Sequence, residues 1–124
     1  MLFDDYVLRQ VQKIAELAAA IAARASGQSH VELDAELAEA YRALLGMDRE
    51  SADRLTPDGL ARLLGEDRQI RALALLMQAQ GDLCEARGQP AAAMRSWERA
   101  LALLAAIDDE ELRDGLVERL ARAT

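Results

Sequence analysis

The sequence LMQAQGDLCEARGQPAAAMRSWERALALLAAI, residues 76–107, decides the fold of this chain. Apolar residues recur every three or four positions on both sides of Gly88, Gln89 and Pro90, which predicts two helices joined by a tight turn. Small residues on one predicted helix stand where they would face large residues on the other. The stretch therefore predicts an antiparallel pair of helices that pack unusually close.

The composition extends this prediction to the whole chain. Of 124 residues, 52% are hydrophobic but only 3% are aromatic, so the core must consist of Leu, Ala, Ile, Val and Met. Leu and Ala favour helices, and β-branched residues are sparse. The chain is also long enough to bury a core of its own. We therefore predict an all-α protein with a single domain, residues 1–124, of about seven helical segments.

Turn and capping residues divide the domain into three parts. A long helix occupies residues 1–26 and ends at Gly27, and a capping box from Ser29 to Glu32 opens a helical bundle segment over residues 29–65. Residues 67–124 form the hairpin and a capping helix, with Asp67 as the expected N-cap of the hairpin's first helix. Asp108 and Asp109 cap the last helix.

The first predicted helix carries a seam of apolar residues. Val7, Ile14 and Ile21 are seven residues apart, and Val11 follows the first of them by four, which is the spacing of a short coiled coil. Such a seam can pack against a second chain or against its own. Because the apolar arc is broad, we predict a homodimer that uses this helix.

Residues 74–107 resemble a tetratricopeptide repeat. The resemblance lies in five positions, with Gly81 in the first helix and Gly88 at the turn, followed by Ala93, Trp97 and Ala100 in the second helix. Gly115 lies one repeat length after Gly81, so the last helix is similar to the cap that follows such repeats. Upstream, Met47 falls where a glycine would be needed, so we expect one repeat only.

The resemblance implies a module for protein–protein interaction or assembly. In this family the first helix of each repeat lines the binding surface, which here places Leu75, Gln78, Asp82 and Glu85 outward. Two of these four carry negative charge, and like charges repel. We therefore expect a protein partner with a basic or neutral-apolar segment, and we expect one repeat to supply only half of a groove.

Three shorter stretches, residues 5–10, 41–48 and 55–60, resemble a bacterial family of small helical proteins of unknown function (the DUF6483 type). The resemblance implies a bacterial source and no particular activity.

Charge and cysteine content exclude several classes of function. With 22 acidic and 15 basic residues the net charge is −7, which would repel a nucleic acid backbone. The apolar run at residues 14–25 is shorter than a membrane span and is interrupted by Glu16 and Arg24. The single cysteine, Cys84, excludes an intramolecular disulfide, and the start of the chain lacks a basic leader. We expect a cytoplasmic protein without membrane or nucleic acid partners.

The sequence offers no recognisable catalytic or metal site. His30 and Cys84 are the only residues of their types, and a zinc site needs three or four such ligands. Arg24 and His30 have the loose spacing of a helical ribonuclease family, but Ser26 and Gly27 break the helix between them. We expect no metal and no cofactor. A small enzyme or nuclease without a recognisable motif, and a ligand-binding helical bundle, remain as alternatives.

Overall fold

The computed structural model describes residues 2–24 and 30–123. These residues form seven α-helices and one short 3₁₀ turn, and contain no strand. The all-α prediction is therefore confirmed. In chain order the elements are α1 (Leu2–Arg24), α2 (His30–Leu45), α3 (Arg49–Asp53), α4 (Pro57–Leu64), α5 (Asp67–Ala86), α6 (Pro90–Leu103), η1 (Leu104–Ala106) and α7 (Glu110–Ala123).

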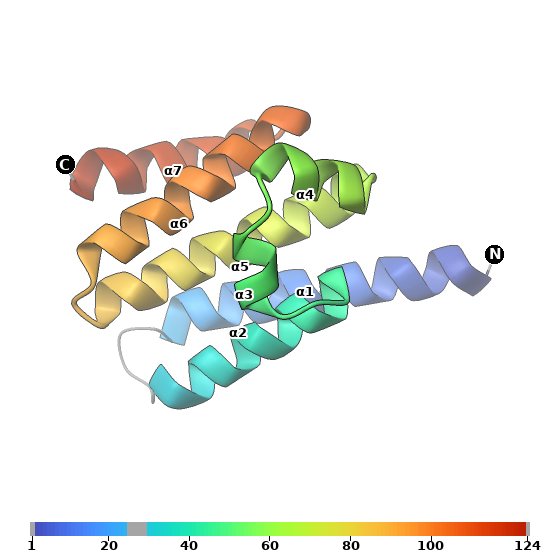
Figure 1. Ribbon diagram of the computed structural model, residues 1–124, viewed down its shortest axis with the longest axis horizontal. Coiled ribbons are helices and arrows are strands. Elements are labelled where there is room, and N and C mark those ends of the chain that lie inside the picture. The colour runs from blue at the N-terminus through green and yellow to red at the C-terminus, as the bar shows by residue number, and fades with distance from the viewer. Residues whose placement is uncertain (1, 25–29, 124) are drawn as a thin grey trace.

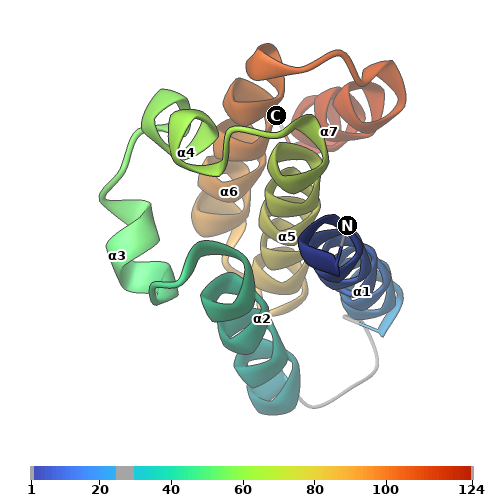
Figure 2. The ribbon, with the colours of Figure 1, turned by 90° about the vertical axis from the view of Figure 1, so that its right-hand side faces the viewer.

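Helix α5 is the central element of the domain, and the other helices are arranged around it (Figure 2). Apolar and small residues surround it on nearly every side, which is the pattern of a buried helix rather than of a surface helix. Its buried residues are Ile70, Ala72, Leu73, Ala74, Leu76, Met77, Ala79, Gly81 and Leu83. The hydrophobic core therefore has one continuous helix running through it.

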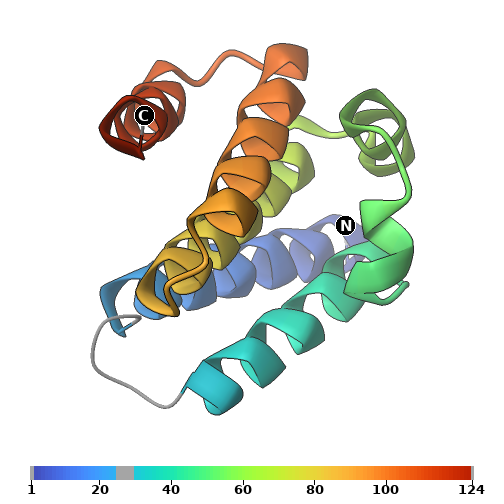
Figure 3. The same cartoon turned by 60° about the vertical axis from the view of Figure 1, so that its left-hand side comes forward.

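The long helices form two antiparallel hairpins and a final single helix. Helices α1, α5 and α7 run in one direction, and α2 and α6 run in the opposite direction (Figure 1). The short helices α3 and α4 lie between the two hairpins in the sequence. In space α3 contacts α2, and α4 contacts α6 and α5 (Figure 3). The first hairpin was not expected as a counterpart of the second, because α3 and α4 lengthen the connection between them.

Close packing of α5 against α6 depends on Gly81 and Trp97. A Cβ atom at Gly81 would lie 2.9 Å or less from three atoms of the Trp97 indole. The indole is fully buried, and its Nε1 donates to the Gln78 carbonyl at 3.3 Å. The predicted close approach is present. The sequence had indicated Ala93 as the closest contact of Gly81, but the nearest side chain to Gly81 is the Trp97 indole.

The turn between α5 and α6 is built on Gly88, which has a φ of 74°. In that left-handed conformation the Gly88 and Gln89 amides donate to the carbonyls of Glu85 and Cys84. This pattern of hydrogen bonds satisfies the last carbonyls of α5, and glycine adopts the conformation without a steric penalty. The predicted role of Gly88 is confirmed.

Side-chain caps fix the ends of the shorter helices. Asp48 accepts a hydrogen bond from the Ser51 amide at 2.8 Å, Thr56 from the Gly59 amide at 3.0 Å, and Asp109 from the Leu112 amide at 3.1 Å. The prediction for Asp67 is wrong, since it is the first residue of α5 and Glu66 is the N-cap. Gly27 and Ser29 lie outside the described residues.

Candidate docking groove

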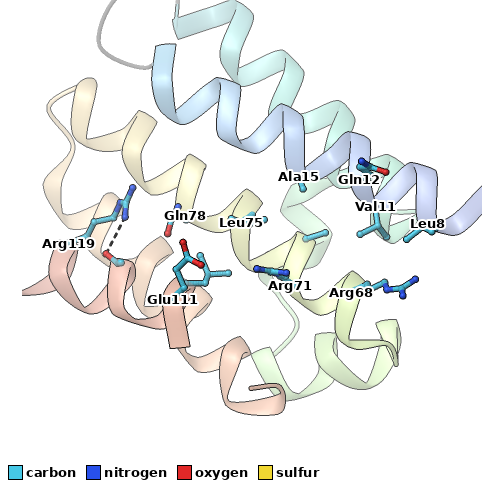
Figure 4. Close-up of a pocket in the computed structure, with 13 residues that line it drawn as sticks. Leu8, Val11, Gln12, Ala15, Arg68, Arg71, Leu75, Gln78, Glu111 and Arg119 are labelled. Atoms are coloured by element: carbon cyan, nitrogen blue, oxygen red, sulfur yellow. Dashed lines mark hydrogen bonds between the residues drawn. The ribbon is translucent and has the colours of Figure 1, made fainter. Parts of the chain in front are cut away.

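A groove of about 650 Å³ lies between α1, α5 and α7, the three long helices that share one direction (Figure 4). Every one of these helices contributes residues to its walls. The lining residues are Leu8, Val11, Gln12 and Ala15 from α1, Arg68, Arg71, Ala72, Leu75 and Gln78 from α5, and Glu111, Leu112, Gly115 and Arg119 from α7.

Small residues and partly exposed apolar residues create this groove. Ala15, Ala72 and Gly115 are too short to fill the space between the helices, and Leu75 remains only half-buried. Leu8, at the open end of the α1 wall, is 41% exposed. An apolar floor that remains accessible to solvent is characteristic of a surface that binds another molecule.

Charged side chains of both signs stand at the edges of the groove. Arg71 pairs with Asp109 at 2.7 Å, and Arg119 forms two hydrogen bonds with Asp82, at 2.8 and 3.2 Å. Arg68 and Glu111 are exposed and form no ion pair with any residue that the structure describes. The arginines of this groove are thus largely balanced by carboxylates of the same chain.

The surface expected on α5 divides into two parts. Leu75 and Gln78 do line the groove, as expected of residues on the binding face. Asp82 does not face outward, because its carboxylate is only 13% exposed and is covered by Arg119 of α7. Glu85 Oε1 lies 3.5 Å from Nη2 of Arg122, which is also on α7. Both carboxylates are thus paired with arginines of α7, and the expected preference for a basic or neutral-apolar segment stays a prediction.

The apolar seam of α1 is used mostly inside the chain. Ile14 and Ile21 are 4% and 0% exposed, respectively, and belong to the core that α1 shares with α2 and α5. Val11 is half-buried and faces the groove. The side chain of Val7 lies outside the described ones. Ile14 and Ile21 are thus not available to a second chain.

The sequence did not identify the other residues of the groove. Arg68, Arg71 and Arg119 look like ordinary solvent-facing arginines when each helix is considered alone. Gly115 was found from its distance to Gly81, but as a repeat position rather than as part of a wall. The sequence pattern of one helix does not indicate which helices pack beside it, and three helices form the walls of this groove.

A smaller cavity of about 300 Å³ lies near Tyr41, Gln80 and Cys84. The buried Tyr41 hydroxyl donates to Gln80 Oε1 at 2.8 Å, and burial raises the pKa of this phenol. Burial also raises the pKa of the Cys84 thiol, so it remains protonated and weakly nucleophilic at neutral pH. This cavity has no histidine in its walls to act as a base for either group.

No protein-family model, no curated protein and no solved structure matches the chain. None of the described helices has the length and apolar character needed to cross a membrane. Within residues 2–24 and 30–123, no three side chains of the His, Cys, Asp and Glu types come together in a way that could hold a metal ion.

Proposed function

We propose that this protein is an interaction or assembly module that binds an apolar segment of another protein in the groove between α1, α5 and α7. The observation that carries the proposal is the groove itself, with an apolar floor and walls from three parallel helices. Grooves between helices commonly bind the apolar face of an amphipathic helix.

The arrangement of helices supports a repeat-like interpretation of this groove. In helical repeat proteins, the first helices of successive hairpins lie parallel and line one concave surface. Here α1 and α5 begin the two hairpins and α7 follows them, and these three helices line the groove. We accordingly extend the tetratricopeptide-like interpretation from one hairpin to two hairpins and a cap, with α3 and α4 as an insertion.

The chemistry of the groove favours a neutral-apolar partner segment. Its floor is aliphatic, and the carboxylates of Asp82 and Asp109 balance Arg119 and Arg71. Affinity would come from apolar burial on the floor, while the charges at the edges would set orientation. We retain a cytoplasmic bacterial setting, without nucleic acid, as part of this proposal.

Site-specific photo-crosslinking in the native organism tests the proposal. A photoreactive residue at Glu111, exposed at the edge of the groove, is compared with one at Val117, which is exposed on α7 but does not line the groove. We expect a protein adduct from position 111 alone, and we expect Leu75→Glu to abolish it by placing a charge in the floor. Adducts from both positions, or from neither, would contradict the proposal.

A ligand-binding bundle is the second candidate, since about 650 Å³ lies within the range of small-molecule sites. Thermal-shift measurements with fatty acids and other apolar metabolites distinguish the two functions. A ligand that raises the melting temperature of the native protein but not of Leu75→Glu would favour this second function.

A further inference from the structure

A second groove, of about 460 Å³, lies between α1 and α2. Ile14 and Ala40 form its buried base and Leu17 and Ala43 its accessible apolar part, while Arg9, Lys13 and Glu39 stand at its edges. No residue of α5, α6 or α7 lines it, so it is separate from the groove described above.

This groove marks a side of the stack that the chain itself leaves open. The α5–α6 hairpin is packed against α1 and α2 on one side and against α7 on the other. The α1–α2 hairpin packs on α5, but no described helix covers its other groove. Stacked hairpins ordinarily bury such a face against a neighbour or end in a polar cap. The half-buried Leu17 therefore faces a groove that no described helix fills.

The edges of this groove carry opposite charges. On α1, Arg9 and Lys13 are exposed and form no ion pair with any described residue. On α2, the neighbouring edge carries Glu32, Glu36 and Glu39 at helical spacing, and Glu39 also pairs with Arg42 of its own helix at 3.5 Å. A patch with a basic edge and an acidic edge complements a copy of itself when a two-fold axis relates them.

We propose that the occupant of this groove is a second copy of the chain. The two α1–α2 hairpins pack face to face, and the basic edge of each α1 lies against the acidic edge of the partner's α2. The apolar floors meet between them, which removes Leu17 from water in both copies. In this dimer Arg9, Lys13 and Leu17 of α1 meet the second copy, while Ile14 and Ile21 stay in the core of their own chain, and the dimer does not depend on the function proposed above.

Charge reversal tests the dimer by sedimentation equilibrium. One variant carries Arg9→Glu and Lys13→Glu, and the other carries Glu32→Lys and Glu39→Lys. We expect the native protein to dimerise and each variant alone to associate at least about tenfold more weakly, because like charges then face each other. An equimolar mixture should associate again, since the acidic α1 edge of one variant then faces an α2 edge of the other on which two of the three glutamates are lysine.

A control reverses the same number of charges on α3 and α4. One control variant carries Arg54→Glu and Arg62→Glu, and the other carries Glu50→Lys and Asp58→Lys. All four positions are exposed. Each control variant should dimerise as strongly as the native protein, and mixing the two should not strengthen their association. Circular dichroism should show native helix content in every variant, since the substituted side chains are exposed. The proposal would be overturned if the native protein is monomeric or if the groove variants dimerise as strongly as the native protein. It would also be overturned if the control variants lose association to the same extent as the groove variants.

Discussion

At the scale of single residues, two glycines that are 34 positions apart have opposite roles. Gly81 lies against the Trp97 indole, whereas a Cβ at Gly115 would meet only Arg119 Nη1 at 3.4 Å and Gln78 Oε1 at 3.8 Å. Both glycines lie inside helices, where alanine is intrinsically better by about 0.5–1 kcal/mol. The surroundings therefore decide whether alanine stabilises or destabilises the protein at each position.

We expect Gly81→Ala to lower the free energy of unfolding by about 1–3 kcal/mol, because the added methyl group displaces the indole. Gly115→Ala should raise the free energy of unfolding by about 0.5–1 kcal/mol, because the added methyl group makes only ordinary van der Waals contacts. Urea denaturation of the two variants measures the contrast. Equal effects would mean that Gly81 is not a close-packing position.

Trp97 is the largest fully buried side chain of the domain. We expect Trp97→Ala to lower the free energy of unfolding by about 3–5 kcal/mol, since it leaves a cavity between α5 and α6. Trp97→Phe retains much of the volume but loses the hydrogen bond to Gln78, and should cost less. Thermal melts within a degree or two of the native protein would refute the packing role of Trp97.

Tyr41 makes stability depend on alkaline pH. Burial, followed by the charge of Asp53, raises the pKa of its hydroxyl in the folded protein. The unfolded chain therefore releases this proton more easily, and stability that is complete below about pH 10 should be lost progressively above it. Urea denaturation between pH 8 and 11 should show a shallower decline in Tyr41→Phe. Cys84 is present in both proteins, so the difference between them reports the Tyr41 hydroxyl together with its coupling to Cys84.

At the scale of elements, α7 packs on α6, and charged pairs connect it to α5. Asp82 and Arg119 form a two-point contact with side chains 13% and 25% exposed, and Arg71 holds Asp109 at the start of α7. Leu112 and Leu116 contribute the buried apolar contacts of the same helix. The position of α7, and with it one wall of the groove, therefore depends on both kinds of contact.

We expect Asp82→Asn to lower the free energy of unfolding by about 1–2 kcal/mol, because Arg119 loses a half-buried charged partner. Arg119→Gln should have a similar effect, and the double variant should cost less than the sum of the two. The control is Asp58→Asn, whose pair with Arg62 is fully exposed and should be worth little. Additive effects at Asp82 and Arg119 would contradict the coupling.

At the scale of the whole molecule, α5 joins both hairpins in one core. Residues of α1, α2, α5, α6 and α7 belong to a single cluster of buried side chains. We expect one cooperative unfolding transition, so fluorescence of Trp97, the only tryptophan, should coincide with far-UV circular dichroism. Separate transitions would show that the α1–α2 hairpin unfolds independently of the second hairpin.

The sequence by itself determined the helices and the close hairpin of this protein. Helix spans follow from apolar periodicity, from caps such as Thr56, and from a turn glycine at Gly88, all of which act over a few residues. The close packing could also be predicted from the sequence, because Gly81 and Trp97 belong to two helices joined by a tight turn. Local chemistry was sufficient for these features.

Only the tertiary structure decided how the helices are assembled. Helices α3 and α4 separate the two hairpins, so spacing along the sequence did not relate the first hairpin to the second. Asp82 and Arg119 are 37 residues apart, and nothing near either residue specifies the other. Burial of Ile14 and Ile21 likewise depends on which helices α1 meets. The groove exists because side chains from three helices leave space between them, and that space is a property of their packing rather than of any one segment.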